Sequence, residues 1–144
     1  MPVLLVGLWA VQRPRISRAG LIGALLYGFA FVYFAHTTLL AIESGVVDYA
    51  ALWERLGSLY TVHGGLMVTG GLAFGGATLA AGVLPRWAAA LFLAGIVLHL
   101  VLVALPLPEI AQTIATTLRN AGLVGMGWAL AHRPRGSAPP SPIG

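Results

Sequence analysis

Four polar side chains that could do ligand chemistry interrupt four otherwise apolar stretches of the chain. They are His36, His63, His99 and Arg119, one in each stretch. Imidazole nitrogens bind metals or haem iron and exchange protons near neutral pH, whereas a guanidinium pairs with carboxylate or phosphate groups. At about 1.5 Å of rise per residue, the histidines lie roughly 6 to 9 Å, and Arg119 about 13 Å, from the same end of their predicted helices. The sequence therefore predicts one polar layer in the outer half of a helical bundle.

A structural network is the simplest interpretation of this layer. Polar side chains inside a membrane bundle form hydrogen bonds between helices and fix the packing. Glu43 follows His36 by two helical turns on the same face, so we expect it to be the ionic partner of Arg119. The side chains predicted to complete the polar cluster are Tyr33, His63, Gln112 and Thr116.

A haem b site is the alternative with the most specific chemistry. Such a site needs two axial histidines at similar depth, a small residue that admits the porphyrin and a cation for its propionates. His36 and His99 would be the axial pair, Gly95 lies one turn before His99, and Arg119 would bind a propionate. This interpretation predicts an electron-transfer membrane subunit.

Two further functions stay open on the residues alone. A zinc site would combine His36, His63, His99 and Glu43, although no local motif such as HExxH accompanies them. A small homo-oligomeric transporter or channel is the other possibility, but such proteins typically need a carboxylate near mid-membrane. No nucleophile elbow, phosphate loop or pair of catalytic carboxylates is present, and no catalytic residue is assigned.

The composition determines which elements must position these side chains. Of 144 residues, 58% are hydrophobic and 8% are charged, and the mean hydropathy is +0.89. Such a chain has too little polar surface for a soluble globule and is typical of a protein in a lipid bilayer. Since the net charge of +4 comes from arginines clustered between apolar stretches, it indicates topology and anionic lipid, not nucleic acid.

The predicted fold is an all-α integral membrane bundle of four transmembrane helices, at about 21–42, 59–83, 87–105 and 110–131. Prolines at 85, 106 and 108 mark helix ends, because proline cannot continue a helix interior. The loop before the second span should hold a short surface helix, capped by Asp48 and anchored by Tyr49 and Trp53.

Arginines set the predicted orientation. Arg13, Arg15 and Arg18 precede the first span, Arg86 lies between the second and third, and Arg133 and Arg135 follow the last, which puts six of the eight on one side. That side is cytoplasmic by the positive-inside rule, so both ends of the bundle face the cytoplasm.

The two ends of the chain lie outside the predicted four-helix domain at 13–135. Residues 1–12 are apolar but too short to span, so we expect an interfacial or truncated segment. The tail at 136–144 is rich in proline and serine and is predicted to be disordered.

Small residues in the second span predict close helix packing. Gly71 and Gly75 form a GxxxG pair, and Ala73, Ala77 and Ala81 form a stripe beside it. Such a surface packs against another helix of the same chain or forms a homodimer. We expect packing within the chain, because all four helices need partners.

The stretch "AAGVLPRWAAALFLAGIVLHLVLVALPLP", with the glycine-rich span before it, resembles a hairpin of bacterial multi-span membrane proteins that share a domain of unknown function. The resemblance implies a bundle in the bacterial cytoplasmic membrane, often with an additional span ahead of it, and carries no activity. The overall expectation is a small accessory, structural or ligand-binding membrane protein, with other membrane subunits as possible partners.

Overall fold

The computed structural model describes residues 1–43, 45, 49–103, 105 and 109–132. Within these residues the chain forms five α-helices and no strand, so the all-α prediction is confirmed. The helices are α1 (Pro2–Ala10), α2 (Arg18–Glu43), α3 (Tyr49–Ala81), α4 (Arg86–Val103) and α5 (Glu109–Ala131). The predicted spans coincide with α2, the longer part of α3, α4 and α5 to within a few residues.

Local signals explain where the helices begin and end. The Ser17 hydroxyl accepts a bond from the Gly20 amide at 3.4 Å and caps the start of α2. Gly82 adopts a positive φ of 61° directly after α3, a conformation that costs glycine little and ends many helices. The next helix, α4, begins after Pro85, as predicted.

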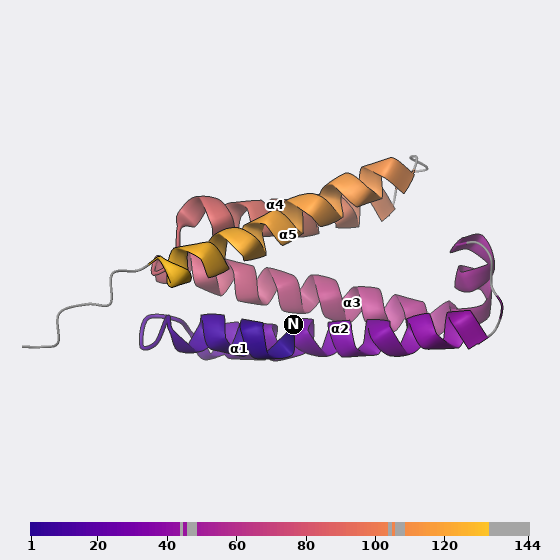
Figure 1. Ribbon diagram of the computed structural model, residues 1–144, viewed down its shortest axis with the longest axis horizontal. Coiled ribbons are helices and arrows are strands. Elements are labelled where there is room, and N and C mark those ends of the chain that lie inside the picture. Colours follow the sequence, from indigo (N-terminus) through magenta and orange to yellow (C-terminus); the bar gives the residue numbers. More distant parts are fainter. Residues whose placement is uncertain (44, 46–48, 104, 106–108, 133–144) are drawn as a thin grey trace, which may run out of the picture.

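A kink divides α3 into a short and a long part. Gly57 has φ 41° and ψ −113°, so the helical path breaks there, and Figure 1 shows the first part turned aside from the long axis of α3. The expected short helix in this loop is therefore present. The side chains of Tyr49 and Trp53, the Asp48 cap, Pro106, Pro108, and the tail with Arg133 and Arg135 lie outside the described residues.

The bundle consists of two antiparallel hairpins, α2–α3 and α4–α5 (Figure 1). Each is held by backbone contacts: a Cβ on Gly70 of α3 would lie 2.5 Å from the Tyr27 amide nitrogen, and one on Gly95 of α4 would lie 2.5 Å from that of Arg119. Such approach tolerates only glycine. Between the hairpins, Gly71 and Gly75 of α3 pack against side chains of α4, which confirms the predicted packing within the chain.

The core lies where the two hairpins meet. Tyr27, Phe74, Phe92, Ile96 and Met126 are among its largest buried side chains, and the ring of Phe92 meets those of Tyr27 and Phe74 edge-on. The short helix α1 packs on α2 and adds Leu5 and Leu8 to the same core. The apolar segment at 1–12 is therefore part of the bundle.

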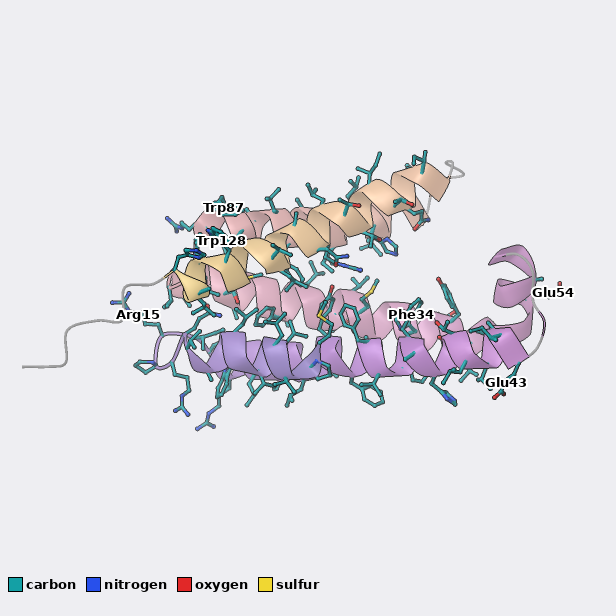
Figure 2. All side chains as sticks on the ribbon, viewed as in Figure 1. Arg15, Phe34, Glu43, Glu54, Trp87 and Trp128 are labelled. Atoms are coloured by element: carbon teal, nitrogen blue, oxygen red, sulfur yellow. The ribbon has the colours of Figure 1, made fainter. Side chains whose placement is uncertain are left out.

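The exterior of the bundle is apolar along its length and charged at its ends. Large apolar side chains such as Ile22, Val124 and Trp128 are more than half exposed. Figure 2 places Glu43 and Glu54 at one end, called here the acidic end, and Arg15, Trp87 and Trp128 at the other, called the arginine end. The segments Arg18–Glu43 and Leu56–Ala81 are long and apolar enough to cross a membrane, whereas the apolar helix Arg86–Leu102 is shorter.

Candidate functional site

Arg119 points into the bundle, as the sequence predicted. Its side chain is only 7% exposed, and Nη1 donates to the Met67 Sδ on α3 at 3.1 Å. The Arg119 side chain can reach α3 because the α5 backbone packs directly against Gly95 of α4. This close packing lets the guanidinium extend past α4. The Nε atom is buried and has no hydrogen-bond partner among the described residues.

His63 is buried among aromatic rings near the middle of α3. Its ring is parallel to that of Tyr33, 6.4 Å away, and 5.3 Å from that of Phe34. It also lies against the backbone carbonyl of Ala30 on α2. The Nδ1 atom of the ring, by contrast, is buried and has no hydrogen-bond partner in the described part of the chain.

His99 on α4 complements His63 from the opposite hairpin. It is half-buried, lies within electrostatic range of both His63 and Arg119, and has a buried Nδ1 without a partner in the described residues. Three donor-bearing side chains thus come from three helices. Met67 on α3 is the residue that Arg119 contacts.

A cavity of about 560 Å³ opens beside these side chains, between α3 and α4. It lies toward the acidic end, where Figure 1 shows the α4–α5 hairpin leaning away from α3. We call it the His63–His99 groove. It is lined by Tyr60, Thr61, His63, Gly64, Gly65, Met67, Val68, Thr69, His99, Leu100 and Gln112.

The structure does not bring Glu43 to Arg119. Glu43 is exposed at the last residue of α2, whereas Tyr27, at the level of the Arg119 guanidinium, is near the middle of that helix. The helix from Tyr27 to Glu43 rises roughly 24 Å, far beyond the reach of an arginine. The predicted ion pair is therefore wrong, because depths estimated from helix ends misjudged how α2 and α5 are aligned.

The haem arrangement is not present either. His36 is exposed on α2, so it does not face His99 across the bundle. Gly95 is packed against the Arg119 backbone, which leaves no space there for a porphyrin. These residues do not fit a haem. Within the described residues, no three His, Cys, Asp or Glu side chains form a metal-binding group, so the predicted zinc set is not assembled.

The remaining predicted residues divide into two sets. Gln112 lines the groove, and Tyr33 supports it by packing against the His63 ring. Thr116 is half-buried on the first half of α5 and does not line the groove.

Two residues of this layer were missed by sequence reasoning. Met67 looks like an ordinary core residue, but it follows His63 by one helical turn and therefore shares its face. Tyr27 is fully buried, and its hydroxyl has no partner in the described part of the protein. The ring of a tyrosine packs like that of any other aromatic core residue. No sequence signal therefore distinguishes Tyr27, with its buried hydroxyl, from the rest of the aromatic core.

The donor set decides which chemistry the site can perform. Arg119 only donates, whereas imidazole and phenol groups donate or accept according to their protonation. Such a set binds acceptor oxygens, and the positive charge of Arg119 opposes a bound cation.

Comparisons with known protein families, curated proteins and solved structures found no match, and the resemblance of the α3–α4 region to bacterial membrane proteins stays a prediction.

Proposed function

We propose that the chain is a four-span membrane protein whose His63–His99 groove binds a small ligand with a polar head. Binding, and not an enzymatic reaction, is its function. The four helices α2, α3, α4 and α5 each contribute one donor side chain to this region of the bundle.

The membrane assignment is supported by what the helices expose. α2 and the long part of α3 meet the length and hydropathy of a span. α4 and α5 complete two hairpins whose outer faces carry Val97, Val101, Val124 and Trp128 in exposed positions. Large contiguous apolar surface is rare on soluble monomers, and a lipid environment would cover it.

The orientation is proposed from the charges at the two ends. The arginine end also has Trp9, whose ring lies 5.4 Å from the Arg13 guanidinium, and the Trp87 and Trp128 side chains. Tryptophan is typical of either membrane interface, whereas an excess of arginine is typical of the cytoplasmic one. The acidic end and the groove then face the outer side of a bacterial cytoplasmic membrane.

One observation carries the ligand-binding proposal. Five buried polar side-chain atoms have no partner among the described residues. One is Gln12 Oε1, and the other four are Arg119 Nε and Tyr27 Oη, His63 Nδ1 and His99 Nδ1, whose side chains lie within electrostatic range of Arg119. Buried polar groups are nearly always satisfied, so such a concentration indicates a partner that is not the protein. The groove beside this layer has the volume of a small-molecule site.

The experiment fills the groove from a position where a side chain fits without strain. Gly64 lines the groove, and a Cβ built on it meets nothing within 4 Å, so Gly64→Leu places three further carbons into the cavity. Gly76 is equally free of neighbours on the same helix but lies outside the groove, which makes Gly76→Leu the matched control.

The full chain and both variants are purified in mild detergent, and co-purified small molecules are identified by native mass spectrometry and absorbance. We expect a bound molecule in the wild type and in Gly76→Leu, and roughly tenfold lower occupancy in Gly64→Leu. Equal occupancy in Gly64→Leu and the wild type, or no bound molecule in either, would contradict the proposal.

A further inference from the structure

We propose that the ligand of the His63–His99 groove carries a phosphate group, and that this group binds Arg119 in place of the Met67 thioether. The inference rests on the ligand-binding function proposed above. It specifies the ligand's head group and the contact of Arg119 that this group replaces.

The first step is the charge of Arg119. The guanidinium is more than nine-tenths buried, and its described hydrogen bond goes to a thioether sulfur. Sulfur is a weak acceptor and carries no charge, so this contact leaves the positive charge unbalanced. Buried charges are normally paired.

The second step is that the described part of the protein offers no carboxylate near Arg119. Among acids whose side chains are described, Glu43 and Glu54 are exposed at the acidic end. The α5 backbone from Glu109 to Arg119 rises roughly 15 Å, which also separates these two residues. Since none of the described acids balances the charge of Arg119, we assign the balancing charge to a bound anion.

The third step is the geometry of the donors. His63 of α3 and His99 of α4 line the groove, while Arg119 of α5 and Tyr27 of α2 do not line it but lie within electrostatic range of each other, as Arg119 does of His99. Donors that converge from several directions suit the tetrahedral oxygens of a phosphate better than the two coplanar oxygens of a carboxylate. Arginine in addition binds phosphate through two parallel N–H bonds.

The fourth step gives Met67 its role. Met67 lines the groove, whereas Arg119 lies behind it, so a ligand in the groove meets Met67 first. Methionine is unbranched and changes rotamer easily. A phosphate oxygen is the stronger acceptor, so it takes the position of Sδ while the methionine side chain moves aside.

A phosphate group could belong to a lipid head or to a free anion, and two arms of one experiment separate these sources. In the first arm, inorganic phosphate is titrated into the detergent-purified full chain at constant ionic strength, and thermal stabilisation is measured. In the second arm, the protein is extracted from nanodiscs that contain phosphatidylglycerol and diacylglycerol with the same acyl chains. Native mass spectrometry then counts the retained lipids.

Four variants test the residues. Arg119→Met removes the charge, Arg119→Lys keeps it without the paired donors, and Met67→Leu removes the sulfur with little change in volume. Arg86→Met, at an exposed arginine of the opposite end, is the control for overall charge. Circular dichroism and the melting temperature establish that each variant is folded.

We expect the wild type and Arg86→Met to bind phosphate or to retain phosphatidylglycerol in preference to diacylglycerol, and whichever arm responds identifies the source. Binding should fall by about tenfold or more in Arg119→Met, less in Arg119→Lys, and should tighten by about threefold in Met67→Leu.

Results that would overturn the phosphate inference can be distinguished from results that would overturn the proposed ligand-binding function. A ligand lost in Gly64→Leu but bound equally by the wild type and Arg119→Met would overturn the phosphate inference and leave the groove as a binding site. A wild type that responds in neither arm would also overturn this inference.

Discussion

The Nη1 atom of Arg119 lies 3.1 Å from the Sδ of Met67, and this contact joins the α4–α5 hairpin to the α2–α3 hairpin inside the bundle. A guanidinium in such a position usually meets a carboxylate. Here it meets an uncharged sulfur, while the carboxylate that its position in the sequence suggested is exposed at the end of α2. The stability of the bundle should therefore be insensitive to that carboxylate.

The replacement Glu43→Ala tests this directly. Glu43 is exposed and occupies the C-terminal end of a helix, where the helix dipole disfavours an acid. We expect the free energy of unfolding in detergent to change by no more than about 0.5 kcal/mol. A loss of several kcal/mol on chemical denaturation would mean that Glu43 has a buried partner after all.

Gly95→Ala should destabilise the protein by about 1 to 3 kcal/mol. The Cβ of the new alanine would lie 2.5 Å from the Arg119 backbone nitrogen, so α4 and α5 would have to move apart. Gly76→Ala is the control, since its Cβ meets open space and alanine favours the helix by about 0.5 to 1 kcal/mol. Thermal unfolding of both variants measures the difference. Equal melting temperatures would show that α4 and α5 are less tightly packed at this point.

Tyr27→Phe should stabilise the protein in the absence of ligand by up to about 1 kcal/mol, because the hydroxyl is fully buried without a partner in the described residues. Tyr33→Phe, at a half-buried tyrosine on the same helix, serves as the comparison and should be close to neutral. If Tyr27→Phe unfolds more easily than the wild type, its hydroxyl is hydrogen-bonded within the site.

Single-cysteine labelling tests the proposed orientation without interference, because the chain contains no cysteine. A membrane-impermeant maleimide should label Glu54→Cys in intact spheroplasts, and should label Arg15→Cys only after the membrane is permeabilised. Labelling in the reverse pattern would place the groove on the cytoplasmic side.

The helices were predictable from the sequence because their signals are local. Apolar length and Pro85 predicted the boundaries of α2 to α5 closely. The burial of Arg119 followed from the cost of exposing a charge to lipid. The site partners were less predictable. Depth along each helix was estimated correctly enough to group His63, His99 and Arg119, but depth does not fix rotation.

The rotation of a helix about its own axis determines whether a histidine faces the bundle or the exterior, as two histidines show. His36 and His63 have similar predicted depths, yet His36 is exposed while His63 turns inward. The contact that constrains these rotations involves the backbone at Gly70, where α3 touches α2 without intervening side chains. A glycine-rich sequence offers many such positions, so the sequence alone does not show which ones are used.

The backbone contacts at Gly70 and Gly95 each join two helices that are consecutive in the sequence. Each hairpin can therefore form as soon as its own two helices are synthesised. The groove exists only after the two units dock, because His63 and Met67 belong to one and His99 and Gln112 to the other. A ligand that binds only the docked form then shifts assembly toward it by RT ln(1 + [L]/Kd). On the proposed function, occupancy of the groove and completion of the bundle form a single coupled equilibrium, in which supplied ligand provides part of the driving force for tertiary assembly.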